Sequence, residues 1–329
     1  MVVPEKAKSD FETLLKDDSV VHYWNEKSGS SGFLLKALVK ANQTESFLDK
    51  AEQMMGSKDG YRLVMQDVEA TLPRIEEEEE EEEKEEKNEI WEKPLQGIRV
   101  SREELYNEIS ESVNLSSTYL AMVTLSTIVA ALGMLRDSTA IVIGAMVIAP
   151  LLGPNVALAL STTLGDSKLF TKSIKTNLSG IGVAFLLSVL LGLLLSVDAS
   201  VYQIASRTEV QLSDIALALA SGAAGVLAYT IGMSVAVIGV MVAVALLPPL
   251  VTTGILIGDM QWDLSFYAFL LLVTNIICVN LSAVATFTLQ GVKPRTWYKS
   301  EKAKKINKIA FSVWIVLLLI LALIIYILQ

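Results

Sequence analysis

Apolar residues dominate the chain from about residue 118 onward, in long runs separated by short polar segments. Each run is near or above the ~20 residues that a helix needs to cross a lipid bilayer. The pattern predicts seven membrane-spanning helices, at residues 118–135, 139–164, 174–197, 215–231, 234–257, 264–289 and 309–328. The fourth and fifth runs are separated by only two residues, so a re-entrant pair is the alternative there.

The polar part of the chain predicts a small α+β domain at residues 1–75. Residues 33–40 and 61–68 have the composition of strands, and apolar positions recur at helical spacing in residues 44–55. We therefore expect a β-α-β unit, with residues 20–24 as an additional candidate strand. A core of roughly 50 residues is small, which favours a packing or oligomerisation domain over a ligand-sensing domain.

Two further segments precede the first predicted span. Residues 76–98 include eight consecutive glutamates and predict a solvated, self-repelling linker. Residues 99–116 carry a capping box at Ser101 and Glu104 and an apolar stripe, which predicts an amphipathic helix on the membrane surface. The transmembrane domain is then expected at residues 117–290, followed at 291–329 by a basic loop and the seventh span.

Lysine and arginine are unevenly divided between the two sides of the predicted bundle. Counted from Lys93 onward, the side with the N-terminal domain and the loops after spans two, four and six carries thirteen of them, against two on the other side. By the positive-inside rule, the N-terminus is predicted to be cytoplasmic and the C-terminus to lie outside. The expected location is the inner or plasma membrane.

Spans two and five resemble each other in sequence. Residues 143–147 (IGAMV) match 238–242 (IGVMV), and 151–154 (LLGP) match 246–249 (LLPP) at the same offset of 95. Residues 164–166 also match 257–259, and 177–179 match 280–282. These matches predict a duplicated three-span unit, and two consecutive units of odd span number must have opposite orientations. The expected architecture is a 3+3 inverted repeat plus one extra helix, as in many secondary transporters.

Prolines interrupt both matched spans near their centres, at Gly153-Pro154 and at Pro248-Pro249. A proline lacks a backbone N–H and frees a carbonyl of the preceding turn, and freed carbonyls must face protein or a wet cavity. We therefore expect discontinuous helices with a midplane site between spans two and five. The candidate pathway residues are Pro150, Gly153, Pro154, Asn155, Thr162, Asn177, Pro248, Pro249, Thr252, Thr253 and Asn280, with Asp166 and Asp259 at the span ends. The alternative interpretation is a packing kink, with the polar side chains serving as interhelical hydrogen bonds.

Several classes of function are excluded by the residues present. One cysteine, Cys278, and one histidine, His22, rule out an internal disulfide and a Cys/His zinc site. No nucleophile–base pair, zinc-protease motif or phosphate loop is present, so neither an enzyme nor a cofactor is expected. The acidic chain lacks a basic patch with aromatic residues, which argues against nucleic-acid binding.

The run DSTAIVIGAMVIAPLLGP at residues 137–154, followed by Gly165-Asp166, resembles a family of prokaryotic membrane proteins. That family is described only as a hydrophobic domain of unknown function, and the residues VEATLP at 68–73 are similar to it as well. The resemblance covers roughly residues 33–290. It implies a membrane protein but supplies no substrate and no catalytic residue.

Two functions are compatible with these features. The first is a carrier or channel for a small solute or ion, with its site between spans two and five. The second is a non-transporting membrane sensor or scaffold that uses the N-terminal β-α-β domain. The expected partners are the lipid bilayer, a small solute or ion, and further copies of the chain in a homo-oligomer.

Overall fold

A computed structural model describes residues 2–4, 14–17, 19–28, 32–40, 43–55, 63–66, 68, 102–233, 235–292 and 297–328. The chain forms two compact units, Met1–Arg102 and Glu103–Gln329. The predicted acidic linker at residues 76–98 lies outside the described residues. The second unit also takes in the segments that were expected to stand apart as a surface helix and as a C-terminal addition.

The first unit combines a three-stranded antiparallel sheet with one helix. Its strands are β1 (Val2–Pro4), β2 (Val20–Ser28) and β3 (Gly32–Val39), in the order β1-β3-β2, and its helix is α2 (Thr44–Met55). A small core joins the helix to the sheet. It consists of Leu14, Leu15, Leu35, Phe47 and Ala51.

This topology corrects the expected β-α-β unit. The predicted strand at 33–40 and helix at 44–55 are present, and the additional strand at 20–24 is part of β2. Residues 63–66 and 68, however, form no strand. Val64 and Val68 are about 60% exposed, at 60% and 58%, so their apolar side chains do not pack on the sheet. The third strand comes instead from Val2–Pro4.

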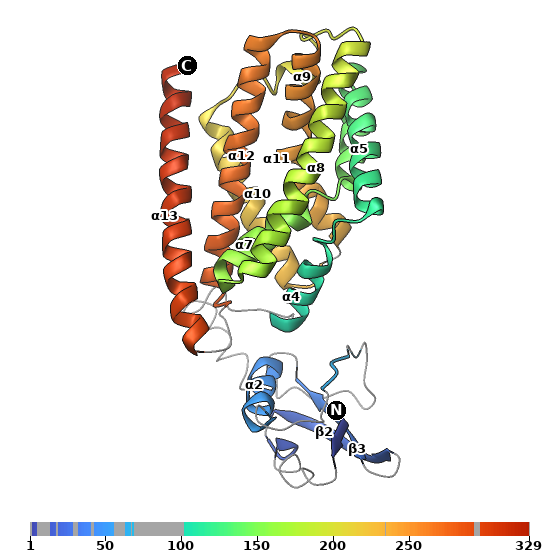
Figure 1. Ribbon diagram of the computed structural model, residues 1–329, viewed down its shortest axis with the longest axis vertical. Helices are drawn as coiled ribbons and strands as arrows, with labels where there is room; N and C mark the ends of the chain where they lie inside the picture. Colours follow the sequence, from blue (N-terminus) through green and yellow to red (C-terminus); the bar gives the residue numbers. More distant parts are fainter. Residues whose placement is uncertain are drawn as a thin grey trace, which may run out of the picture. The chain divides into compact units, whose positions relative to one another are not determined.

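The second unit is a bundle of helices (Figure 1). A short helix, α4 (Arg102–Glu111), precedes the apolar helices. These are α5 (Ser117–Leu135), α6 (Thr139–Ile148), α7 (Leu152–Leu164), α8 (Ser167–Leu194), α9 (Tyr202–Ala205), α10 (Leu212–Thr230), α11 (Val235–Gly258), α12 (Trp262–Leu289) and α13 (Trp297–Leu328). Figure 1 places α4 at one end of this bundle and α9 at the other.

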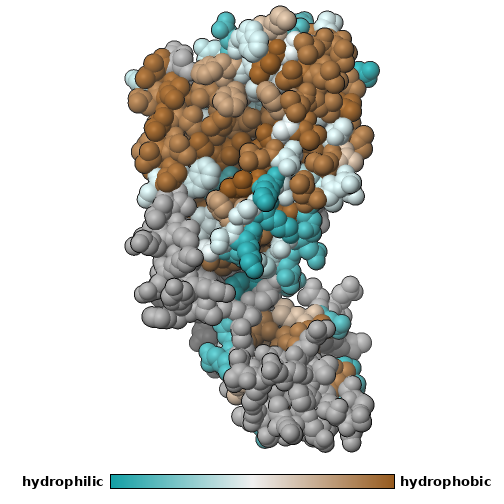
Figure 2. Space-filling model, viewed as in Figure 1, coloured by the Kyte–Doolittle hydropathy of each residue, from teal (hydrophilic) through white to brown (hydrophobic). Residues whose placement is uncertain are grey.

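Four of these helices, α5, α8, α10 and α12, are long and apolar enough to cross a membrane. The pair α6 and α7, bent by 52° at a short break, adds a fifth span if the two helices are counted together. In the described parts of α11 and α13 the apolar stretches are shorter, at Ala245–Gly258 and Phe311–Ile327. The helices are those of a membrane protein, and Figure 2 shows hydrophobic residues over most of the coloured surface of this unit. A total of seven spans stays a prediction.

The position of the helix break differs from the expected one. Ala149, with ψ of 116°, is extended between α6 and α7, because a residue before proline avoids helical geometry and Pro150 follows it. Pro154 lies in the first turn of α7, where a missing N–H removes no intrahelical bond. In contrast, α11 runs through Pro248 and Pro249 without interruption. Within the described residues, span two is therefore the one discontinuous span.

Candidate functional site

Three buried asparagines from three different helices form a cluster around the side-chain oxygen of one of them. Asn155 lies on α7, Asn177 on α8 and Asn280 on α12, and they are 2%, 8% and 1% exposed. The Nδ2 of Asn177 donates to Asn155 Oδ1 at 3.0 Å, and the Nδ2 of Asn280 donates to the same oxygen at 3.3 Å. Of the residues proposed from the sequence, these three form a cluster.

The helix break positions the central amide of this cluster. Asn155 lies in the second turn of α7, and its Nδ2 donates to the Leu151 carbonyl at 2.8 Å. The Nδ2 of Asn280 also donates to the Ile276 carbonyl of its own helix. These bonds fix two of the amide groups, so the cluster is held rigidly between α7, α8 and α12.

Two oxygens of the cluster have no hydrogen-bond partner in the described part of the chain. They are Oδ1 of Asn177 and Oδ1 of Asn280. An unpaired buried polar atom typically costs about 1–3 kcal/mol. A purely structural network normally satisfies such atoms, so these two acceptors mark the cluster as a candidate binding site.

A small cavity adjoins two of the asparagines. Its volume is about 10 Å³, counted as the space open to the centre of a water molecule. That is about the minimum for one buried water, so the site is closed in this conformation. The cavity is lined by Leu151, Asn155, Asn177, Ile181, Leu246, Leu250, Leu272 and Ile276.

A side chain of the neighbouring helix α12 replaces a hydrogen bond that Pro249 removes from α11. Pro249 has no N–H to offer the carbonyl of Ala245, four residues earlier, and the Nδ2 of Asn275 on α12 donates to that carbonyl at 2.8 Å. Thr253 Oγ1 donates to the Pro249 carbonyl at 2.7 Å. At Pro249 the structure therefore fits the alternative interpretation, in which polar side chains satisfy a packed helix, and α11 also continues through Pro248.

The threonines proposed for the pathway do not join the cluster either. Thr162 Oγ1 donates to the Leu158 carbonyl of its own helix, and the hydroxyl of Thr252 faces the sulfur of Met134 at 3.9 Å. Both threonines are buried. Gly153 and Pro154 lie next to the cluster in the sequence, in the first turn of α7.

The two aspartates lie at helix ends, apart from the asparagine cluster. Asp166 is the N-cap of α8, where its side chain accepts from the N–H groups of Lys168 and Leu169. Asp259 follows α11 and accepts from the side chain of Gln261. Within the described residues, neither carboxylate is hydrogen-bonded to an asparagine of the cluster, and no group of three metal-ligating side chains occurs.

Comparison with known proteins identifies the family. An uncharacterized protein of Methanocaldococcus jannaschii is 38% identical over 325 residues, which cover 98% of this chain and 97% of the relative. A family model described as a domain of unknown function, DUF389, matches residues 146–281. The chain belongs to the DUF389 family. The resemblance to a family without known function is thereby confirmed in its broad form. No solved structure matches the chain.

The region that matches the DUF389 model contains the whole cluster. Asn155, Asn177 and Asn280 all fall between residues 146 and 281, as does Pro150 at the helix break. The site therefore lies in the part of the chain that defines the family, and not in the N-terminal unit.

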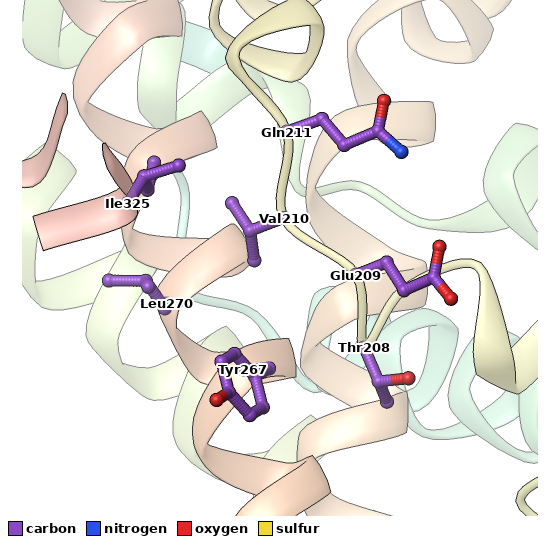
Figure 3. Close-up of a pocket in the computed structure, with 7 residues that line it drawn as sticks. All are labelled: Thr208, Glu209, Val210, Gln211, Tyr267, Leu270 and Ile325. Atoms are coloured by element: carbon purple, nitrogen blue, oxygen red, sulfur yellow. The ribbon is translucent and has the colours of Figure 1, made fainter. Parts of the chain in front are cut away.

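A larger pocket of about 350 Å³ in this DUF389 protein was not anticipated from the sequence. Figure 3 shows Tyr267, Leu270 and Ile325 on one side of it, whereas Glu209 and Gln211 extend away from them. Because no polar side chains converge there, the pocket is a weaker candidate than the asparagine cluster. The residues that line it have the ordinary composition of loops and helices, so no motif in the sequence predicts a pocket there.

Proposed function

We propose that this DUF389 protein provides a route for a small polar solute or ion across the membrane, with the asparagine cluster as its central site. The observation that carries the proposal is a buried, uncharged polar site with two unpaired acceptors beside a broken helix. Intramembrane polar groups are costly, and helix breaks at membrane depth are tolerated where they face protein or a cavity.

The chemistry of the cluster favours a particular class of solute. Amide groups both donate and accept hydrogen bonds, and the eight residues that line the cavity carry no charge. A site of this kind suits a small neutral polar molecule or a single weakly hydrated ion. It offers no partner for a large or strongly charged solute.

The proposal includes the inverted repeat, and helix lengths support it. The helices α5 and α10 both have 19 residues and begin at 117 and 212, while α8 and α12 both have 28 residues and begin at 167 and 262. Both pairs are therefore offset by 95 residues. The left-handed residues Asp137 and Gly232, and Gly165 and Met260, have the same offset.

The cavity lining follows the same offset. Its eight residues form four pairs that are each 95 positions apart: Leu151 with Leu246, Asn155 with Leu250, Asn177 with Leu272, and Ile181 with Ile276. A cavity lined by equivalent positions of two halves is expected on the two-fold axis that relates them. In this register the counterpart of Asn177 is Leu272, and not Asn280 as the short sequence matches suggested.

The remaining membrane topology is part of the same proposal. We place α11 and α13 among the spans, which gives seven, with the N-terminal unit in the cytoplasm. The protein acts without enzymatic chemistry and assembles as a homo-oligomer in the inner or plasma membrane. Protease added to sealed vesicles of known orientation tests the topology, and cleavage of the N-terminal unit from outside intact cells would contradict it.

Solute flux in proteoliposomes tests the function. The purified chain is assayed against water, urea, glycerol, ammonium, sodium, potassium and chloride, with empty liposomes as the baseline. We expect at least one solute to cross faster than the baseline, and the Asn155→Leu variant to lose that flux. Thr171→Val, which removes only a hydroxyl bonded to its own helix, is the matched control. Flux at baseline for every solute would sink the transport proposal and favour the sensor or scaffold hypothesis.

A further inference from the structure

The helix α4 packs its apolar stripe against the helices of the second unit. Its apolar stripe, Leu105, Ile109 and the following Val113, is fully buried. A surface helix would turn that stripe toward lipid. A ten-residue helix is also too short to be stable alone in water, so its formation depends on the contacts that it makes with the bundle.

Three polar contacts tie α4 and the turn after it to the start of α8. The Tyr106 hydroxyl donates to Asp166 Oδ2 at 2.8 Å, at the junction of α7 and α8. Lys172 Nζ donates to the Ser110 carbonyl at 3.0 Å, and Thr176 Oγ1 donates to the Val113 carbonyl at 2.9 Å. The Ser110 carbonyl belongs to the last turn of α4, where carbonyls lack intrahelical partners and a lysine is favourable.

The turn after α4 closes on the helix that carries the central asparagine. A Cβ placed on Gly153 would lie 2.5 Å from Ser112 Oγ and 2.7 Å from its Cβ, so the turn approaches the backbone of α7 directly. Gly153 stands between Pro150, at the break, and Asn155. The end of α4 therefore covers the first turn of α7, next to the cluster.

The opposite end of the bundle carries a comparable cover. Ile204 of α9 is fully buried, and the side chain of Gln203 donates to Thr139 Oγ1 at 2.6 Å. Ile204 lies 95 positions after Ile109, which is the offset of the proposed repeat. Both covers are in place in this structure, which agrees with the closed cavity.

We propose that α4 is the gate of the asparagine site on its side of the membrane, latched by the Tyr106, Lys172 and Thr176 contacts. The inference rests on the proposed function, because it concerns access to that site. Release of the latch frees the turn at Ser112 from α7 and opens the cluster to water.

Cysteine accessibility tests the gate without knowledge of the solute. In a Cys278→Ala background, a Leu151→Cys probe at the cavity is labelled with a membrane-impermeant maleimide in proteoliposomes. The latch-free variant combines Tyr106→Phe, Lys172→Met and Thr176→Val. We expect its probe to react about ten-fold faster than in the latched protein, which corresponds to ~1.4 kcal/mol. Faster hydrogen exchange in α4, with unchanged exchange in α12, verifies that the latch is released and the bundle folded.

The matched control carries the same three substitutions away from the latch and from α9: Tyr326→Phe, Lys175→Met and Thr171→Val. Its labelling rate should equal that of the latched protein. Equal rates in the latched and latch-free proteins, with α4 released, would overturn the gate. So would fast labelling of the latched protein, since the site would then be open already. If the solute flux depends on Asn155 but is the same in the latched and latch-free proteins, the gate is contradicted and the proposed function is not. If no solute flux is found, the proposed function is contradicted. If only the triple variant fails to fold, the single Tyr106→Phe change must still accelerate labelling.

Discussion

Replacement of Asn155 by leucine should destabilise the protein more than replacement of its partner Asn177. In Asn155→Leu, the Nδ2 of Asn177 loses its acceptor, while Asn177 Oδ1 already has no donor. One buried amide is left with neither partner, at a cost of about 1–3 kcal/mol. Asn280 is affected less, because its Nδ2 keeps the Ile276 carbonyl.

The substitution of Asn177 leaves no other amide of the cluster without a hydrogen-bond partner. In Asn177→Leu, Asn155 Oδ1 still accepts from Asn280, and an oxygen that was unpaired is removed. We expect a change within about 1 kcal/mol of zero, since only one neutral hydrogen bond is lost. The double variant Asn155→Leu/Asn177→Leu should recover much of the loss caused by Asn155→Leu alone, because both ends of the bond become apolar.

Thermal unfolding of the purified full-length protein in detergent measures this cycle. A change of 1 kcal/mol shifts the midpoint by about 2–4 °C in a unit of this size. Asn155→Leu should therefore lower the midpoint by about 2–12 °C, and the double variant by less. Equal losses for the two single variants, or simple additivity in the double variant, would refute the unpaired-amide reasoning and the hydrogen-bond assignment within the cluster.

Three further predictions concern the contacts around the site. Gly153→Ala should destabilise the docked α4 by about 1–3 kcal/mol through overpacking, and Ser112→Gly should partly rescue it, as read by hydrogen exchange of α4. In thermal unfolding, Asn275→Leu should lower the free energy of unfolding by about 1–2 kcal/mol, because the Ala245 carbonyl is left without a hydrogen-bond donor. The loss should be much smaller in a Pro249→Ala background, where the backbone N–H of residue 249 can donate to that carbonyl. Protection of α4 against hydrogen exchange, corrected for intrinsic rates, should fall as the pH drops below 3.8 toward the lowered pKa of Asp166, where the carboxylate takes up a proton.

The sign of the pH effect follows from the shifts of the two latch groups. Burial raises the pKa of Asp166, but the bonds from Leu169, Tyr106 and Lys168 outweigh it and hold the pKa below its ordinary 3.8. Its stabilisation is present above pH 3.8 and is lost as the pH falls through the folded value. Burial and Asp166 raise the pKa of Tyr106 to about 12, so that contribution is complete below pH 10 and is lost as the pH rises through 12. An acid loss identical in Tyr106→Phe would contradict this assignment.

Each substitution has an internal comparison. A Cβ on Gly182 of α8 meets nothing within 4 Å, so Gly182→Ala should be neutral or slightly stabilising, since alanine is the better helix former. If Gly182→Ala and Gly153→Ala behave alike, the close approach of Ser112 is not what makes Gly153 sensitive. If Asn275→Leu costs the same with and without Pro249, the asparagine does not act on the freed carbonyl.

The helices of the membrane unit were largely predictable because their pattern is imposed by the solvent. Apolar runs ended close to the observed bounds, as at residues 118–135 and 264–289 against Ser117–Leu135 and Trp262–Leu289. A bilayer requires a continuous apolar helix of a given length, so composition alone locates the span. The sheet of the first unit was less predictable, because strand pairing between Val2–Pro4 and β3 depends on contacts distant in the sequence.

The details of the site required the packing of the helices. The sequence predicted breaks at Gly153-Pro154 and Pro248-Pro249, but Pro154 falls in a first turn, the break lies at Pro150, and α11 is continuous. It also marked Asn155, Asn177 and Asn280, yet it could not tell that two of these would donate to the third. Side chains on different helices meet according to helix rotation and crossing, and short polar residues in an apolar run carry no record of either.

The two proposed halves contribute unequally to the lining of the cavity. On one side Asn155 and Asn177 supply polar groups, whereas their counterparts at the same offset, Leu250 and Leu272, supply an apolar wall. The amide that crosses from the second half to the first is that of Asn280, and its bond to Asn155 is the longer of the two, at 3.3 Å against 3.0 Å. The bond between Asn155 and Asn177 lies within one half, so a rigid movement of one half against the other preserves it. Such a movement would break the bond between Asn280 and Asn155 and separate the polar side from the apolar wall.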